Sequence, residues 1–141
     1  MFYFAYGSNM DGAQMRHRCP DSQVVCRGVL EGWQFYINER GVASIWRDPA
    51  SEVHGVVYDC SPQDIANLDR FEGVWAGRYG RFYMDVRSVS TKHIRRCITY
   101  IDPSAMLGTA RKGYMDRVLG GACQHKLPKT YIEFLKKQGW L

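Results

Sequence analysis

The chain is 141 residues long, with 45% hydrophobic and 23% charged residues and a formal net charge of +5. This composition excludes a disordered protein, and the length predicts one domain covering residues 1–141. No apolar run approaches the ~20 residues that cross a bilayer, and the run at residues 1–6 is too short for a signal-peptide core, so we expect a cytoplasmic protein with no membrane partner.

Seven segments are rich in β-branched or aromatic residues and are bounded by Gly, Pro, Asp or Asn, a pattern that predicts strands. In chain order they are Met1–Tyr6, Gln23–Leu30, Gln34–Asn38, Ala43–Trp46, Glu52–Asp59, Phe82–Val86 and Cys97–Ile101. Helices are expected at Met10–Arg18, from Ser61 onward, at Lys112–Gly120 and at Pro128–Gln138. Because strands dominate the middle of the chain and helices its ends, we predict an α+β fold with a mixed sheet that could curl into a barrel.

The first ten residues combine a short aromatic strand, a glycine turn and a helix start. Tyr6 leads directly into Gly7, Ser8 and Asn9, after which the spacing becomes compatible with a helix. This geometry directs several backbone N–H groups at one anion or at one developing negative charge. An ordinary β-turn is the simpler interpretation of the glycine turn taken alone. The end of the first strand is therefore a candidate active site that needs a second feature to support it.

The helix that begins at Ser61 supplies that feature. It has a capping serine, a proline at its first position and an acidic residue in its first turn. Ile65, Leu68 and Glu72 share one helical face, which places Glu72 at the edge of the predicted core. Partial burial would raise the pKa of Glu72 toward that of a useful base, and the nearby Asp69 and the helix C-terminus would act in the same direction. An exposed glutamate at a frayed helix end is the simpler alternative, which periodicity alone favours.

Metal, disulfide and nucleic-acid chemistry have little support in the sequence. The five cysteines are odd in number and widely spaced, so we expect free thiols in a reducing compartment. The four histidines lack zinc-type spacing, and no metal site is expected. Basic residues gather around residues 92–96 and near the C-terminus, which could suit nucleic acid. The modest net charge favours small anionic substrates instead, so no nucleic-acid partner is expected.

Three motifs occur in order along the chain. They are Tyr-Phe-Ala-Tyr-Gly-Ser-Asn at residues 3–9, Glu-Val-His-Gly-Val-Val-Tyr at 52–58 and Leu-Asp-Arg-Phe-Glu-Gly-Val at 68–74. Together they resemble the γ-glutamylcyclotransferase family. The resemblance then thins to a helix around Tyr114 and a Leu127-Pro128 turn. Asn9 in the glycine turn is similar to the classical cyclotransferases and their antibiotic-pathway relatives, whereas the glutathione-specific branch usually has leucine there.

The resemblance implies a small mixed β-barrel with flanking helices and no cofactor. It also implies an enzyme that cyclises a γ-glutamyl group to 5-oxoproline and releases the attached amine or amino acid. In this family the glutamate that matches Glu72 is the catalytic acid and base. The implied substrate-binding residues are Tyr3, Phe4, Ala5, Tyr6, Gly7, Ser8, Asn9 and Tyr114.

Such a reaction is compatible with the residues present. The substrate supplies its own nucleophile, its α-amine, so no serine or cysteine nucleophile is needed. That amine is mostly an ammonium at neutral pH, with a pKa of about 8, so a base must take its proton, and Glu72 could later protonate the departing nitrogen. Backbone N–H groups around Gly7 and Ser8 would bind the γ-carbonyl oxygen as it becomes negative. Tyr6 and Tyr114 could donate hydroxyls to the glutamyl carboxylate or could be core aromatics.

The alternative function is a protein that binds a γ-glutamyl or another anionic small molecule on the same fold without turnover. A pure anion binder gains nothing from a desolvated glutamate, which argues against this alternative. The released amine stays open among an amino acid, a polyamine, a protein-derived isopeptide and an antibiotic intermediate.

Overall fold

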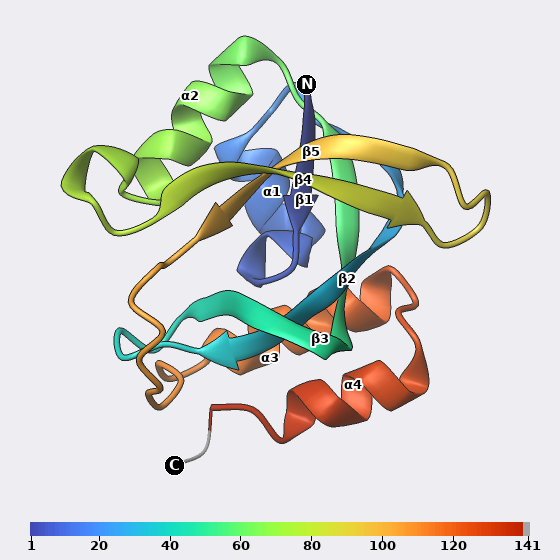
Figure 1. Cartoon of the computed structure of the whole chain (residues 1–141). Coiled ribbons are helices and arrows are strands. Elements are labelled where there is room, and N and C mark those ends of the chain that lie inside the picture. Colours follow the sequence, from blue (N-terminus) through green and yellow to red (C-terminus); the bar gives the residue numbers. More distant parts are fainter. Residues whose placement is uncertain (140–141) are drawn as a thin grey trace.

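A computed structural model describes residues 1–139 and contains a closed five-stranded barrel (Figure 1). The strands are joined in the order β1-β3-β2-β4-β5, with β1 antiparallel to β3 and parallel to β5. The sheet is therefore mixed, and the predicted α+β barrel is confirmed. The strands are β1 (Phe2–Ala5), β2 (Gln23–Ile37), β3 (Ala43–Asp59), β4 (Gly80–Ser88) and β5 (Ile94–Ile101).

Four of the predicted strands are halves of two long ones. The segments expected on either side of residues 31–33 form the continuous β2, and those on either side of residues 47–51 form β3. The pairing of β2 with β3 shifts between Glu31 and Trp33, where Gly32 has a φ of +85°. Such an irregularity bends and twists a strand without ending it, so a long strand can curve around a barrel. The residues that predicted a gap between two strands therefore mark a bend within one strand.

Helices lie at both ends of the barrel. The first helical prediction divides in two, because Asp11 caps a new helix and accepts a hydrogen bond from the Ala13 N–H at 3.3 Å. In Figure 1, α2 lies at the opposite end of the barrel from α3 and α4. The helical elements are η1 (Ser8–Met10), α1 (Gly12–Arg18), α2 (Pro62–Phe71), η2 (Val74–Ala76), α3 (Tyr114–Gln124) and α4 (Lys129–Lys136).

The third predicted helix starts later and runs further than expected. We expected it to stop at Gly120, yet α3 continues to Gln124. A Cβ on Gly121 would lie 2.5 Å from the backbone carbonyl carbon of Met10, so the glycine allows α3 to approach η1 closely. Tertiary packing thus overrides the helix-ending tendency of a glycine pair. None of the helices in residues 1–139 is long and apolar enough to cross a membrane.

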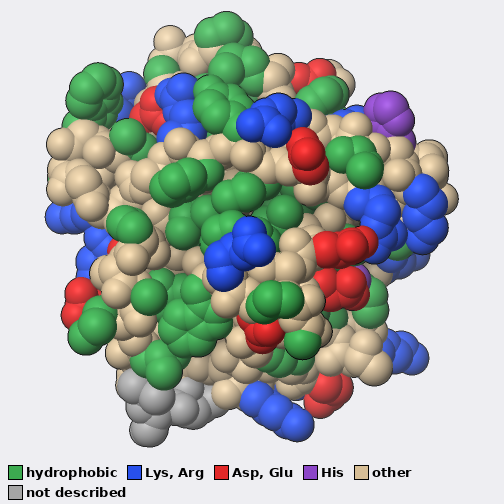
Figure 2. Space-filling view, in the orientation of Figure 1, with side chains coloured by type: hydrophobic (Ala, Val, Ile, Leu, Met, Phe, Trp, Pro, Cys, Tyr) green, Lys and Arg blue, Asp and Glu red, His purple; other side chains and the backbone are tan. Residues whose placement is uncertain are grey.

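The core fills the barrel and continues beneath the helices, and on the face shown in Figure 2 hydrophobic side chains lie among Lys, Arg, Asp and Glu. Phe4, Phe35 and Leu68 are among its fully buried side chains, and they come from β1, β2 and α2 respectively. β1 is short and buried, and its N-terminal end is fixed by the Cys60 N–H, which donates to the Met1 carbonyl at 2.7 Å. The strand that leads into the glycine turn is therefore anchored in the fold at its start.

Candidate active site

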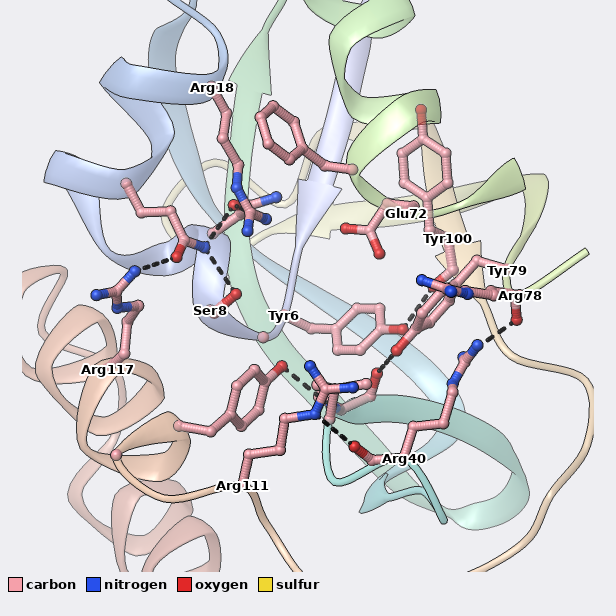
Figure 3. Close-up of a pocket in the computed structure, with 18 of the residues that line it drawn as sticks. Tyr6, Ser8, Arg18, Arg40, Glu72, Arg78, Tyr79, Tyr100, Arg111 and Arg117 are labelled. Atoms are coloured by element: carbon pink, nitrogen blue, oxygen red, sulfur yellow. Dashed lines mark hydrogen bonds between the residues drawn. The ribbon is translucent and has the colours of Figure 1, made fainter. Parts of the chain in front are cut away.

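A cavity of about 450 Å³ opens where the end of β1, the end of α2 and the start of α3 meet (Figure 3). All but one of the predicted site residues line it, although they are spread from residue 3 to residue 114. The predicted residues that line the cavity are Tyr3, Phe4, Tyr6, Gly7, Ser8, Asn9, Glu72 and Tyr114. The fold thus brings the glycine turn and the glutamate to one cavity.

Ala5 is the exception among the predicted site residues. It is buried but does not line the cavity. Ala5 pairs with Val56 in the barrel, and a Cβ on the neighbouring Gly55 would lie 2.3 Å from the Ala5 carbonyl oxygen. The structure therefore places Ala5 in the close pairing of β1 with β3 and not at the cavity wall.

The end of α2 aims Glu72 into the cavity. Ile65 and Leu68 anchor one face of the helix in the core, as the periodicity predicts. Glu72 ends the helix, and its N–H donates to the Leu68 carbonyl at 2.8 Å. The chain then turns through Gly73, whose φ of +64° suits glycine, and a Cβ there would lie 2.9 Å from Cδ of Arg78. Figure 3 shows the Glu72 carboxyl group projecting between Arg18 and Tyr100, above the Tyr6 ring.

Burial raises the pKa of Glu72 from 4.5 to about 7, against the opposing effects of Arg18 and Arg40. The direction agrees with the sequence prediction, but one of the predicted causes is wrong. Asp69 adds no repulsion because its carboxylate pairs with Arg81 and accepts the Tyr100 hydroxyl at 2.7 Å. Glu72 is thus a carboxyl group that exchanges its proton near neutral pH while cations surround it.

Asn9 holds a polar network beneath the glycine turn. Its side-chain amide donates to the Tyr3 hydroxyl at 3.0 Å, and its amide oxygen accepts from Gln14 at 2.9 Å and from Arg18 at 3.2 Å. Gln14 also donates to the Ser8 hydroxyl at 2.7 Å. Asn9 is 3% exposed, so these hydrogen bonds are shielded from bulk water. They fix Tyr3 and Arg18 at the cavity wall.

Tyr114 and Gly7 form the opposite wall. The Tyr114 hydroxyl oxygen accepts from the Ala43 N–H at 3.0 Å, and burial raises the pKa of Tyr114 although hydrogen bonds with Ala43 and Ser8 act in the opposite direction. A Cβ on Gly7 would lie 3.0 Å from that oxygen, so only glycine leaves this contact undisturbed. Tyr6 differs, because its hydroxyl donates to the Tyr100 carbonyl. The core-packing interpretation therefore suits Tyr6, whereas Tyr114 can face substrate.

Sequence reasoning missed the arginines of the cavity. It placed the basic charge around residues 92–96 and near the C-terminus, none of which lines this cavity. The cations that do line it come from the end of α1, the β2–β3 turn, the loop before β4, the loop before α3 and α3 itself. Arg111 and Lys112, three and two residues before Tyr114, and Arg117, three residues after it, had a local signal in the predicted Tyr114 helix that could have revealed them. The lining cations are Arg18, Arg40, Arg78, Arg111, Lys112 and Arg117.

Comparison with known proteins identifies the family. Residues 52–135 match the AIG2-like family. The chain is 31% identical to the γ-glutamylcyclotransferase of Mus musculus over 144 aligned positions, which cover 95% of this chain and 76% of the mouse protein. The chain belongs to the γ-glutamylcyclotransferase family.

Further members of the γ-glutamylcyclotransferase family support this assignment. The Homo sapiens γ-glutamylcyclotransferase is 28% identical, again over 95% of this chain and 76% of the relative. A solved γ-glutamyl cyclotransferase structure superposes with a TM-score of 0.91 at 26% identity and covers 98% of this chain and 87% of that one. The family resemblance seen in the three sequence motifs is thereby confirmed, and so is the barrel that it implies.

Proposed function

We propose that this protein is a γ-glutamylcyclotransferase that converts a γ-glutamyl group to 5-oxoproline and releases the attached amine. The observation that carries the proposal is Glu72, a carboxyl group with a pKa of about 7 that faces the glycine turn across a cationic cavity. The relatives named γ-glutamylcyclotransferase, which belong to the same family as this chain, also support the proposed cyclisation.

The charges of the cavity suit the two charged groups on the α-carbon of a glutamyl group. Such a group carries an α-carboxylate and an α-ammonium, so its site needs one cation and one anion. Arg18 and Glu72 supply them, because Arg18 lies close enough to lower the pKa of Glu72 and makes no ion pair within residues 1–139. We infer that Arg18 binds the α-carboxylate while Glu72 meets the α-ammonium.

The raised pKa makes the first proton transfer easier. An ordinary glutamate at 4.5 would have to take a proton from an ammonium of pKa about 8, at a cost of about 5 kcal/mol. With the pKa of Glu72 at about 7, the same transfer costs about 1.4 kcal/mol. The freed amine attacks the γ-carbonyl carbon and closes the five-membered ring. Glu72 then gives its proton to the departing nitrogen as the amide C–N bond breaks, and the ring nitrogen passes its second proton to the Glu72 carboxylate, which returns it to solvent or to the released amine.

The glycine turn can receive the charge that develops on the γ-carbonyl oxygen. The hydrogen bonds of η1 run from the Met10 N–H to Gly7 and from the Asp11 N–H to Ser8, so the N–H groups of Ser8 and Asn9 have no acceptor within the turn, and the Ser8 N–H faces the Tyr114 hydroxyl. The Tyr114 hydroxyl group lies beside Gly7, and we infer that it donates its proton to the γ-carbonyl oxygen when substrate is bound. Donors of this kind, fixed before the reaction, contribute about 3–4 kcal/mol each in other enzymes.

The test is release of 5-oxoproline by the wild-type protein and by Glu72→Gln, with circular dichroism to verify folding. Glu39→Gln is the matched control, because Glu39 is exposed and does not line the cavity. We expect turnover by the wild type and the control and a loss of at least 100-fold in Glu72→Gln. A folded Glu72→Gln protein with near wild-type turnover would refute the role of Glu72. Saturable binding of γ-glutamyl compounds with no 5-oxoproline from the wild type would favour the non-catalytic binding protein.

A further inference from the structure

The mouth of the cavity carries more positive charge than a glutamyl group can neutralise. Six cationic side chains and a single carboxylate, that of Glu72, line the cavity. Two of the six are already paired with acids outside it: Arg40 with Asp102 at 3.3 Å, and Arg117 with Asp11 at 3.7 Å. Four cations therefore lack an acidic partner within residues 1–139.

These four cations lie in two tiers. Arg18 is half-buried beside Glu72, where its guanidinium also stacks on the Phe71 ring at 4.6 Å. Arg78, Arg111 and Lys112 are exposed at the rim, and we call these three the mouth cations. In Figure 3, Arg111 and Arg78 lie on different sides of the opening around Glu72. They come from the loop before β4 and the loop before α3, so only the fold brings them together.

A γ-glutamyl group leaves the mouth cations unneutralised. Its α-carboxylate and α-ammonium match Arg18 and Glu72 and cancel each other in net charge. The remaining part of the substrate, the amine to be released, must pass the mouth cations on its way out. Three like charges around one opening raise the local concentration of anions and repel a second ammonium. A polyamine or an unmodified lysine side chain would therefore meet repulsion there.

We propose that the amine released from the substrate carries two or more negative charges, as carboxylates or as a phosphate. This proposal rests on the proposed function and names the substrate class of the same cavity. Arg111 is positioned to bind such an anion. Its Nε donates to the Arg40 carbonyl at 2.7 Å, which fixes the side chain while its two terminal nitrogens remain available to a ligand. Arg78 and Lys112 make no side-chain hydrogen bond or ion pair in the described part of the chain.

A substrate series that varies only the charge of the released amine tests the proposal. γ-Glutamyl-glutamate and γ-glutamyl-glutamine have almost the same shape and differ by one negative charge. γ-Glutamyl-phosphoserine replaces the second carboxylate with a phosphate, and γ-glutamyl-putrescine ends in an ammonium. We expect kcat/KM for γ-glutamyl-glutamate to exceed that for γ-glutamyl-glutamine about tenfold at low salt, chiefly through KM, with putrescine the poorest substrate. The ratio should fall severalfold at roughly 0.5 M salt, because exposed charges are screened.

The variant Arg78→Gln/Lys112→Gln assigns the effect to the mouth. It should bring the ratio of kcat/KM for γ-glutamyl-glutamate to kcat/KM for γ-glutamyl-glutamine close to one, through a larger rise in KM for the glutamate conjugate. Lys129→Gln/Lys137→Gln is the matched control, because it removes two exposed charges that do not line the cavity. We expect this control to keep the wild-type ratio. A phosphoserine conjugate that surpasses γ-glutamyl-glutamate would identify phosphate as the preferred anion.

Several outcomes would overturn the proposal. Equal kcat/KM for the glutamate and glutamine conjugates would do so, as would a ratio that the mouth variant does not change. Binding to the inactive Glu72→Gln protein separates this failure from failure of the proposed function. If that protein prefers γ-glutamyl-glutamate while the wild type releases no 5-oxoproline from any conjugate, the reaction is wrong and the charge recognition stands. If 5-oxoproline is released without any charge preference, the reaction stands and the substrate class is wrong.

Discussion

Replacing Glu72 with glutamine should abolish release of 5-oxoproline and yet stabilise the fold above pH 7. The reason is that burial raises the pKa of Glu72 to about 7, so the ionised carboxylate is less stable in the folded protein than in the unfolded chain. A carboxyl group whose pKa is raised on folding stabilises the fold at low pH. That contribution is lost as the pH rises from the unfolded pKa of about 4.5 through the folded value of about 7.

The size of the effect follows from the shift. A rise from 4.5 to about 7 corresponds to a free-energy cost of at most about 3 kcal/mol at pH 8. Glu72 is partly exposed in the cavity, so water screens its charge and we expect about 1–2 kcal/mol in practice. For a chain of this size, that gain shifts the melting temperature upward by roughly 3–8 °C.

Urea denaturation of the wild type and Glu72→Gln at pH 4 and pH 8 measures this effect. Glutamine has no charge to bury, so the variant should be more stable at pH 8, and the difference should shrink towards zero at pH 4. The exposed-site control Glu39→Gln should show no such dependence on pH. A stability difference between Glu72→Gln and the wild type that stays the same from pH 4 to pH 8, or that moves against the variant as the pH rises, would contradict the raised pKa of Glu72.

Other predictions concern the wall opposite Glu72 and the pH dependence of catalysis. Gly7→Ala should lower the free energy of unfolding by about 1–3 kcal/mol, because the new Cβ would lie 3.0 Å from the Tyr114 hydroxyl oxygen. Tyr114→Phe in the same chain should recover part of that loss, and strictly additive losses in urea denaturation would contradict the contact. Tyr114→Phe alone leaves the Ala43 N–H without its acceptor, so we expect the free energy of unfolding to fall by about 1–3 kcal/mol. We also expect a lower kcat. An unchanged kcat would show that the hydroxyl group takes no part in the mechanism. The acid limb of the kcat/KM profile should lie near pH 7, where Glu72 ionises, and a limb near 4.5 would indicate a different base. Arg18→Gln should move this limb to higher pH, since Arg18 lowers the pKa of Glu72, and an unmoved limb would count against their proximity.

Local determinants made much of the site predictable. The start of α2 is set by Ser61 and Asp64, which exchange two hydrogen bonds of 3.1 Å in a capping box. The periodicity that follows then fixes which helical face is buried, and it places Glu72 at the edge of that face. The glycine turn after β1 could be found for the same reason, because its residues are neighbours in sequence.

Features that depend on distant segments were missed or misjudged. The predicted break in β2 became a bend because the barrel pairs both halves with β3, and α3 ran through Gly121 because η1 packs against it. Asp69 was expected to repel Glu72, but Arg81, on a different element, pairs with it. In each case a partner far along the chain changed the outcome of a local tendency.

The sequence by itself determined the family and the two halves of the candidate site, the glycine turn and Glu72, since caps, turns and helical faces depend on residues a few positions apart. Only the tertiary structure decided the electrostatics of the cavity. The mouth cations Arg78, Arg111 and Lys112 belong to loops that are far apart in sequence. Closure of the barrel brings those loops together. No local pattern in the sequence predicts that they lie around the same opening.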